Sequence, residues 1–517
     1  VDAETKQEVT FNELRRTSAT IALSLLSRGI VPSDVITLIE KTSLEAFSVA
    51  IGTLFSGSAI NVLDAGWTAS TVLPALIPLL KPKIIFCHVS AEEILIPVIN
   101  GNGLEDTHII IYGGDSNYGY QTYEELVEEF GQSEDLDTYR PTTIEDIHKT
   151  TAAISCTSGS TGTPKGVMVP HAALHQLITP LREADLNGMT VFTNSGMSWG
   201  SGLFILISGL IGGARRAFTK EPFNEENLLR IMREYKPGLM LLSSYQLSLM
   251  NLYLQDKEDL AEPFGDVMLL FAVGSKLSPQ QVETMQKHLK NGKLVVSYGL
   301  TECMGGTTTI TCAEYRPGTV GHVLMNTELK IVDTSTGETL GPNRQGEMYL
   351  RGPTMLGYYG RPEATSEVLD PETGWFKTGD IGYYDEDHYV YVTDRIKEIA
   401  KYKGIYINPS DIEIVISRHP SVRSCAVVSV PNDEVCDLMV GFVELLPDYK
   451  DKVTAQELEI YTNENVQDYE KLRGGLYILD ELPVLTHGKI AKALLKQKAK
   501  EMLNEIMSKF NNKLLSR

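Results

Sequence analysis

Short apolar runs alternate with amphipathic, helix-like patterns over most of the chain. The clearest apolar runs lie at 35–39, 84–87, 109–112, 239–242 and 267–271. Runs of this length joined by helices of about a dozen residues are typical of βαβ units, whose strands are buried on both faces. The pattern therefore predicts a large α/β domain with mostly parallel sheets.

The pattern changes twice toward the C-terminus. Residues 318–360 hold short strand-like runs separated by Gly, Pro and Asn turns, which predicts a small antiparallel or barrel-like subdomain. After a strand signal at 389–392, the chain carries a new mixture of strand and helix signals, which indicates a smaller α+β domain. We therefore predict an N-terminal domain at 1–393, a hinge at 394–397 and a C-terminal domain at 398–517.

Composition excludes several classes of function. The chain has 517 residues and a formal net charge of −21, from 46 Lys and Arg against 67 Asp and Glu. So acidic a surface argues against general nucleic-acid binding and against binding to anionic membranes. The six cysteines form no CxxC pair, which disfavours a disulfide framework or a zinc site and favours a reducing setting. No apolar run approaches the roughly 20 residues needed to cross a bilayer, so we expect a soluble intracellular protein, in the cytoplasm or, although the chain ends without Ser-Lys-Leu, the peroxisome.

Residues 155–166, SCTSGSTGTPKG, form a distinctive polar stretch without an acidic residue. Glycines let the backbone approach a ligand and present N–H groups to it, and the hydroxyls and the lysine add further donors. The stretch therefore suits the phosphates of a nucleotide, although it is not the GxxxxGK[ST] P-loop, because Lys165 is followed by Gly166. Most runs of such composition are only flexible polar loops, but the ordered series ending in Pro-Lys-Gly is far more specific.

This stretch resembles the phosphate-loop signature of the adenylate-forming enzymes, which include acyl-CoA synthetases, 4-coumarate–CoA ligases, beetle luciferases and peptide-synthetase adenylation domains. Further stretches resemble other motifs of that superfamily and occur in the same order: Tyr298-Gly299-Leu300-Thr301-Glu302, Trp375-Phe376-Lys377-Thr378-Gly379-Asp380, Asp394-Arg395-Ile396-Lys397-Glu398, Lys401-Tyr402-Lys403-Gly404 and Gly488-Lys489-Ile490. The stretches 351–353 and 471–475 are similar to the insect luciferase-like and 4-coumarate-ligase-like branch. The resemblance implies a large α/β domain that carries a smaller, mobile C-terminal domain.

The resemblance also implies a reaction in two halves, with ATP, Mg²⁺ and coenzyme A. A carboxylate attacks the α-phosphorus of ATP to give an acyl-adenylate and pyrophosphate, and a thiol then displaces AMP. Both steps build negative charge on oxygen atoms, so they need well-placed cations and dipoles more than a protein nucleophile. The partner would be a small carboxylic acid, fatty or arylpropenoic, and the sequence gives no oligomeric state.

Roles for individual residues follow from the same resemblance. Asp380 would hold the two ribose hydroxyls through charge-assisted hydrogen bonds, and Arg395 would approach the ribose or the phosphates. Thr301 would contact the α-phosphate, and Glu302 would bind Mg²⁺, which prefers hard oxygen ligands together with nucleotide phosphates. The wider nucleotide site would consist of Thr157, Ser158, Gly159, Ser160, Thr161, Gly162, Lys165, Gly274, Ser275, Lys276, Tyr298, Gly299 and Lys489. Only the glycine of 274–276 agrees with the family's adenine-binding segment, so that match is weaker.

Two lysines of the C-terminal domain are assigned to different half-reactions. Lys489 would stabilise the charge that grows between the carboxylate and the α-phosphate, and Lys401 would face the site in the second half-reaction. Lys403 and Gly404 would contact coenzyme A. Lysines on two faces of one domain suit a domain that rotates about the hinge at 394–397, where the end of an element can absorb the motion.

One stretch departs from the family pattern. Beetle luciferases and plant ligases carry a His-His-x-x-G-type stretch at the entrance to the acyl pocket, where this chain has Ser198 and Trp199. An indole can gate a tunnel or line an apolar pocket, but it cannot transfer a proton as an imidazole can. The change disfavours luciferin chemistry and favours a carboxylate with an apolar tail, bound by Ser198, Trp199 and Gly299. An ordinary core tryptophan is the alternative for Trp199.

We expect an acyl-CoA synthetase, and three alternatives stay open. The first is a luciferase-like monooxygenase that uses the same adenylation followed by O₂. The second is an adenylation module that loads a carrier protein with an amino acid, although the chain has no convincing Asp near residue 195 to hold an α-ammonium group. The third is an inactive binding module, which the intact set of key side chains disfavours.

Overall fold

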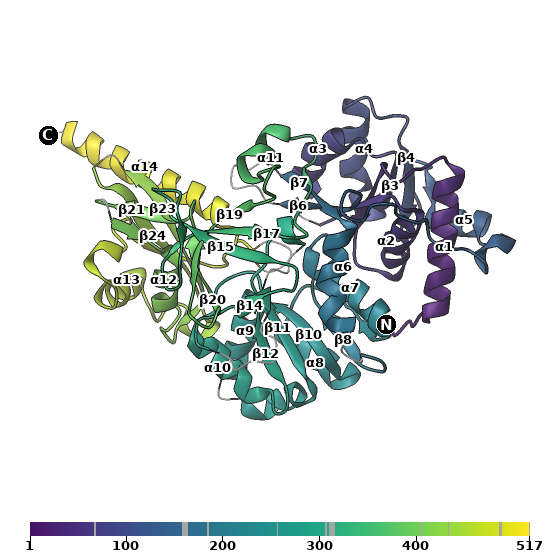
Figure 1. Ribbon diagram of the computed structural model, residues 1–517. Helices are drawn as coiled ribbons and strands as arrows, with labels where there is room; N and C mark the ends of the chain where they lie inside the picture. Colours follow the sequence, from purple (N-terminus) through teal and green to yellow (C-terminus); the bar gives the residue numbers. More distant parts are fainter. Residues whose placement is uncertain are drawn as a thin grey trace.

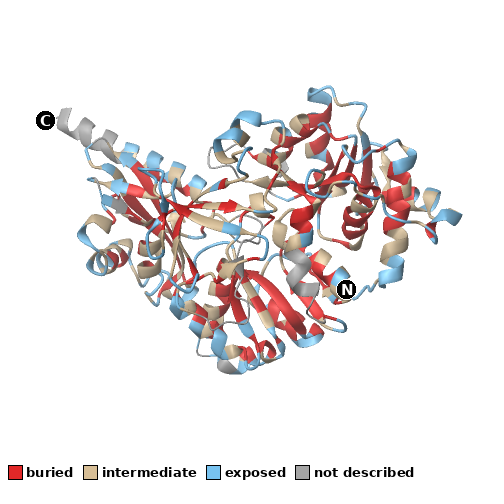
Figure 2. Ribbon diagram, in the orientation of Figure 1, coloured by how far each residue is buried: buried red, intermediate tan, exposed pale blue. Residues whose placement is uncertain are grey.

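The computed structural model describes residues 1–66, 69–157, 164–182, 186–255, 257–304, 308–309, 316–403, 405–432, 434–484 and 489–515. A large lobe is followed by a smaller C-terminal lobe, which is drawn in light green to yellow in Figure 1. Buried residues concentrate in the strands and on the helix faces against them (Figure 2). Among the described residues, no helix is both long and apolar enough to cross a membrane.

The first sheet of the large lobe is parallel except at one end, where the pairings β6–β7 and β7–β18 are antiparallel. The predicted runs at 35–39, 84–87 and 109–112 form three of its strands, which confirms that part of the pattern. In order across the sheet, the strands are β18 (Gly357–Tyr358), β7 (Lys165–Pro170), β6 (Thr151–Thr157), β2 (Ala59–Asp64), β1 (Val35–Glu40), β3 (Ile84–His88), β4 (His108–Tyr112) and β5 (Gln121–Thr122).

Strand β1 shows why these runs are apolar throughout. Ile36 and Leu38 pack into a core shared with helices α1 and α2, whereas Val35 and Ile39 pack into a second core shared with α3 and α4. Thr10 caps the start of helix α1, because its side chain accepts a hydrogen bond from the Glu13 N–H in a capping box. The helices of this part are α1 (Phe11–Ser27), α2 (Leu44–Ser56), α3 (Ala69–Leu80), α4 (Glu92–Gly101), α5 (Tyr123–Phe130) and α6 (His171–Arg182), with the 3₁₀ turns η1 (Val89–Ala91) and η2 (Glu134–Leu136).

The second sheet of the large lobe is parallel in every described pairing. Its strands are β12 (Lys293–Val296), β11 (Leu269–Val273), β10 (Pro237–Ser243), β8 (Thr190–Thr193) and β9 (Arg215–Ala217), in that order. The accompanying helices are α7 (Gly200–Gly212), α8 (Glu225–Tyr235), α9 (Ser244–Leu254) and α10 (Pro279–His288), with η3 (Glu258–Asp266) and η4 (Thr301–Cys303). Because the ligand sites of parallel sheets lie beyond the carboxyl ends of the strands, this edge is where a site is expected.

The third sheet is antiparallel, as the turn-rich stretch predicts, but it extends past residue 360. Its strands are β16 (Thr339–Leu340), β15 (Glu328–Val332), β17 (Gly346–Arg351), β19 (Phe376–Tyr384) and β20 (Val390–Arg395), and a separate pair joins β13 (Thr308–Thr309) to β14 (His322–Val323). Helix α11 (Pro362–Val368) lies between β18 and β19 in the sequence. Strand β20 ends at Arg395, so the first two residues of the proposed hinge belong to this sheet.

The small lobe has one sheet with apolar cores on both faces. Val427 and Val443 pack toward α12 and α13, whereas Val428 and Phe442 pack toward α14. The strands are β22 (Ile405–Ile407), β21 (Ala400–Tyr402), β24 (Cys436–Leu445) and β23 (Val422–Asn432), and β25 (Leu476–Leu479) pairs with β24. The helices are α12 (Pro409–Ile416), α13 (Ala455–Glu464) and α14 (Lys492–Leu515), with η5 (Pro447–Tyr449) and η6 (Asp468–Glu470).

Candidate active site

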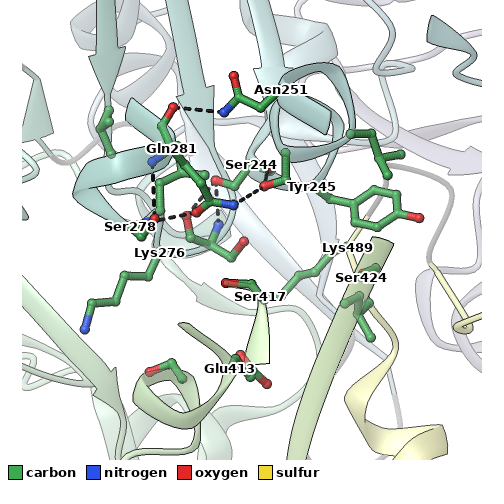
Figure 3. Close-up of a pocket in the computed structure, with 18 of the residues that line it drawn as sticks. Ser244, Tyr245, Asn251, Lys276, Ser278, Gln281, Glu413, Ser417, Ser424 and Lys489 are labelled. Carbon is green, nitrogen blue, oxygen red and sulfur yellow. Dashed lines mark hydrogen bonds between the residues drawn. The ribbon is translucent and has the colours of Figure 1, made fainter. Parts of the chain in front are cut away.

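A cavity of about 1980 Å³ lies between the two lobes. On the large lobe, its wall includes residues at or just beyond the ends of the parallel strands β2, β10, β11 and β12. On the small lobe, its wall includes residues of α12, β23 and the start of α14 (Figure 3). Small-molecule sites commonly have volumes of about 300–1,000 Å³, so this cavity has room for more than one ligand.

Asp380 is the most buried acid of the cavity wall, with an exposed fraction of 3%. The Tyr298 hydroxyl donates to its Oδ2 at 2.5 Å, and Nε of Arg395 lies 3.1 Å from its Oδ1. The pairing of β19 with β20 sets Asp380 directly opposite Arg395, and the preceding Gly379 takes a φ of +71°. Burial raises the pKa of Asp380, while Arg395 and Tyr298 act in the opposite direction.

Lys489 enters the same cavity from the small lobe. It lies next to Ile490, which bridges to Val484, and shortly before α14 begins. Burial and the positive charge of Arg395 lower the pKa of Lys489, whereas Glu398 and Asp380 raise it. The predicted residues Asp380, Arg395 and Lys489 therefore share one electrostatic environment, although they come from both lobes.

Glu302 lies in η4 and forms a contact that the sequence did not reveal. The Tyr358 hydroxyl donates to Oε1 of Glu302 at 2.9 Å, and the Lys165 ammonium lies 4.7 Å from the centre of the Tyr358 ring. Tyr358 thus connects the lysine of the phosphate-loop stretch to the acid predicted to bind Mg²⁺. A carboxylate with one engaged oxygen fits Mg²⁺, which proteins bind through one or two carboxylates plus substrate phosphates. Among the described residues, no group of three or more His, Cys, Asp or Glu side chains is placed to hold a metal ion by itself.

The segment predicted to bind adenine follows β11 and lines the cavity. Gly274 has a φ of +108° and open space where a Cβ would lie, so its backbone is accessible. The Ser244 hydroxyl donates to the Ser275 carbonyl at 2.6 Å, which fixes the loop. The Lys276 ammonium points to the small lobe, where it lies 3.0 Å from Oδ1 of Asp411, so this side chain joins the lobes. Figure 3 shows Ser244 and Lys276 on this wall.

Ser198 and Trp199 line the cavity just before α7. The Ser198 N–H donates to Oε1 of the buried Glu40 at 2.6 Å. The Trp199 carbonyl accepts hydrogen bonds from the N–H groups of Gly202 and Leu203, so the turn continues directly into the helix. Sequence reasoning missed Glu40, because a Glu at the end of an apolar run is usually a solvated charge. Gly299 also lines the cavity.

Several predicted residues lie elsewhere or cannot be described. Lys401 and Lys403 are exposed, in β21 and directly after it, and neither occurs in the part of the cavity wall that the structure describes. Thr157 ends β6, and Thr301 begins η4. The predicted residues Ser158, Gly159, Ser160, Thr161, Gly162 and Gly404 lie outside the described residues.

Comparison with known proteins decides the family. The model of the “AMP-binding enzyme” family matches residues 1–359, and that of the “AMP-binding enzyme C-terminal domain” matches residues 411–489. The chain belongs to the AMP-binding enzyme family. The stretch between the two matches, residues 360–410, contains β20 and the proposed hinge.

Individual relatives of this AMP-binding enzyme differ in reaction. The chain is 29% identical over 511 residues to luciferin 4-monooxygenase of Photinus pyralis, which covers 95% of this chain and 88% of that protein. It is 26% identical over 510 residues to 4-coumarate-CoA ligase 1 of Narcissus pseudonarcissus, with 95% and 89% covered. ATP-bound MatB from Rhodopseudomonas palustris has a similar structure, with a TM-score of 0.81 at 21% identity over 96% of this chain and 94% of that one. At this identity the structural match shows the fold alone, and it confirms the predicted two-lobed fold.

Proposed function

We propose that this AMP-binding enzyme is an AMP-forming acid–thiol ligase that converts a carboxylic acid, ATP and coenzyme A into an acyl-CoA, AMP and pyrophosphate. The observation that carries the proposal is the convergence of Asp380, Arg395 and Lys489 in one cavity between the lobes. An acid that can accept hydrogen bonds from a ribose lies there beside two cations that can face a phosphate. Such an arrangement suits phosphoryl chemistry, which depends on positioning and on stabilisation of charge.

In the first half-reaction, an oxygen of the carboxylate forms a bond to the α-phosphorus of ATP, and pyrophosphate leaves with the electron pair of the broken bond. Lys489 stabilises the negative charge that grows on the oxygens between the two reactants, and Arg395 adds to it. Thr301 and Lys165 hold the phosphates. Glu302 would hold Mg²⁺, which would offset part of the negative charge of the nucleotide.

In the second half-reaction, the thiolate of coenzyme A attacks the acyl carbon, and AMP leaves with the electron pair on its phosphate oxygen. Lys401 and Lys403 are exposed on a different part of the small lobe. We propose that this lobe rotates about the hinge at 394–397 and so brings both lysines, together with Gly404, to the site. The fatty or arylpropenoic tail of the acid lies against Trp199, Ser198 and Gly299, because an indole and a short hydroxyl suit a tail without charge.

One assay tests the proposal. The purified protein is incubated with ATP, Mg²⁺, coenzyme A and a panel of fatty, arylpropenoic and amino acids, and AMP, acyl-CoA and light are recorded. We expect AMP and acyl-CoA in equal amounts with at least one acid and no AMP when the acid or Mg²⁺ is omitted. Absence of magnesium-dependent binding of ATP or of a stable acyl-AMP analogue would overturn the proposal.

A luciferase-like monooxygenase is the second candidate, because luciferin 4-monooxygenases are among the relatives. It shares the adenylation half-reaction and differs in the acceptor, which is O₂ instead of a thiol. Light or consumption of O₂ without acyl-CoA in the same assay identifies this activity. AMP formation with an amino acid, without a thioester to coenzyme A, identifies a carrier-loading adenylation module instead.

A further inference from the structure

Glu40 is a buried glutamate behind the part of the cavity wall that Ser198 and Trp199 form, where we propose that the carboxylic acid substrate binds. It is the last residue of β1, and 3% of its surface is exposed. Its Oε1 accepts the Ser198 N–H at 2.6 Å, and a methyl group on Gly196 would lie only 2.7 Å from the same oxygen. The carboxylate therefore fills the space behind the turn 196–199, and a glycine leaves room for it.

The other oxygen of Glu40, Oε2, has no hydrogen-bond partner within the described chain. The Arg216 guanidinium on β9 is the cation that favours the ionised form of Glu40. Its carbon lies 4.2 Å from the centre of the Phe47 ring, and its buried nitrogens likewise have no hydrogen-bond partner among the described residues. An acid and a cation are thus enclosed near each other without a mutual hydrogen bond.

Several charged or titratable groups face Glu40 from the packed elements. Burial raises the pKa of Glu40 to about 7, with Asp64 of β2 acting in the same direction and Arg216 and the Ser198 N–H in the opposite one. Tyr112 of β4 also faces it, since the charge of Glu40 raises the pKa of that phenol. Burial of an acid with so few partners is unfavourable for folding alone. Stability therefore does not explain why an acid stands at this buried position, whereas its hydrogen bond to the adjoining turn does.

We propose that Glu40 is a positioning residue whose negative charge holds the turn carrying Ser198 and Trp199 against the acid-binding wall of the cavity. A hydrogen bond to an ionised carboxylate is shorter and about twice as strong as one between neutral groups. Loss of the charge therefore loosens the turn that precedes α7 and moves Trp199. The consequence for the acid substrate rests on the proposed function, whereas the movement of Trp199 does not.

The sign of the pH effect separates positioning from a purely structural role. The ionised form of Glu40 dominates as the pH rises through about 7, so the turn is held more firmly above that pH. Global stability changes in the other direction, because the folded protein binds a proton that the unfolded chain has already released between about pH 4.5 and 7. The contribution of Glu40 to the free energy of unfolding therefore falls as the pH rises through that window.

Fluorescence tests the positioning without any substrate. The chain has three tryptophans, and the substitutions Trp67→Phe and Trp375→Phe leave Trp199 as the only reporter. We expect its emission to change with an apparent pKa near 7 and the change to disappear in Glu40→Gln, which keeps the shape but does not titrate. Gly196→Ala should also abolish it, because the methyl group displaces the carboxylate. The matched control is Glu92→Gln, a fully buried glutamate bonded to Ser116 and Asn117, which should leave the titration unchanged.

Kinetics then test the link to the acid. Glu40→Gln should raise the KM for the acid roughly five- to tenfold above pH 7, the difference expected between a charge-assisted and a neutral hydrogen bond, and leave the KM for ATP unchanged. The proposal is wrong if the Trp199 titration persists in Glu40→Gln, or if both KM values rise together. If no acid is activated at all, the proposed function fails, and the fluorescence result alone decides the role of Glu40.

Discussion

The two lysines that the family pattern singles out on the small lobe have opposite surroundings. Lys489 lies in the cavity between the lobes, where burial and Arg395 lower its pKa. Lys401 is exposed on β21, and its backbone N–H donates to Asp437 of the same lobe. One lobe thus presents one lysine to the large lobe and exposes the other, which in the proposed reaction suits the first half-reaction.

Two ion pairs link the lobes in this arrangement. Lys276 pairs with Asp411 at 3.0 Å, and Arg423 of the small lobe lies 3.5 Å from Glu225 of the large lobe. An exposed pair such as Lys276–Asp411 stabilises by about 0.2–1 kcal/mol, whereas Glu225 is only 14% exposed and its pair is screened less. The difference between the two lysines therefore teaches that a second orientation of the small lobe is needed before Lys401 can reach the cavity, and at least one ion pair that opposes such a change is weak.

The largest expected effect comes from Lys489→Ala. Removing one group that stabilises transition-state charge costs about 10²–10³-fold in rate, so adenylate formation should fall by that factor. Thioester formation from a supplied acyl-adenylate should change far less. Pyrophosphate–ATP exchange measures the first step and acyl-CoA release measures the second. If Lys489→Ala slowed both steps equally, Lys489 would not act specifically in adenylate formation, and the two lysines could not be assigned to different half-reactions.

The reciprocal change, Lys401→Ala, sharpens the comparison. Thioester formation should fall about tenfold, the size of one lost charge-assisted contact, with little effect on pyrophosphate–ATP exchange. The matched control is Lys450→Ala, an exposed lysine on the same lobe, which should leave both steps unchanged. If Lys401→Ala lowered pyrophosphate–ATP exchange and left thioester formation unchanged, Lys401 would act in the first half-reaction, and its assignment to the second would be wrong.

A smaller effect concerns pH. The ammonium form of Lys489 is the active one, so adenylate formation should decline as the pH rises through its lowered pKa, earlier than for an exposed lysine. Lys489→Arg keeps its charge, since the pKa of arginine is about 12 or higher, and should move the decline to higher pH. The readout is the pH profile of pyrophosphate–ATP exchange, compared within each variant. If the rate of Lys489→Arg declined at the same pH as that of the unsubstituted protein, the titration of another group would cause the decline.

The smallest effect should come from the ion pair between the lobes. Asp411→Asn removes the partner of Lys276, which should shift the balance between the two orientations by up to about fivefold. We expect the ratio of thioester formation to pyrophosphate–ATP exchange to be higher in Asp411→Asn than in the unsubstituted protein. At high salt this difference between the two proteins should disappear, because salt screens the ion pair. An unchanged ratio would show that the pair does not bias the lobes.

Much of the fold could be predicted because burial on both faces leaves a plain signal. The run at 35–39 is apolar at every position, and it forms β1 between two cores. The run at 267–271 was displaced by two residues, because Val267 closes η3 through a hydrogen bond to Phe264 and Met268 is 56% exposed. Periodicity cannot separate the last residue of a turn from the first of a strand.

The site was predictable where motifs carry it and not where distant contacts do. Asp380, Arg395 and Lys489 lie in motifs, and the structure brings them together. The contact of Tyr358 with Glu302 spans 56 positions, and that of Glu40 with Ser198 spans 158. Neither pair leaves a local pattern, since a tyrosine in a strand and a glutamate at the end of one are ordinary residues until the fold places them.

The hydrogen bonds of Asp380 have a consequence for turnover in the proposed reaction. Tyr298 and Arg395 each already contact one of its oxygens, so an arriving ribose either shares these oxygens with them or displaces one of them, and it gains less than it would from a free carboxylate. The phosphates would then supply a larger share of the binding energy for ATP, and the share of the β- and γ-phosphates is lost when pyrophosphate departs. AMP would leave behind a carboxylate that recaptures its resident partners at once, which favours rapid product escape in every cycle.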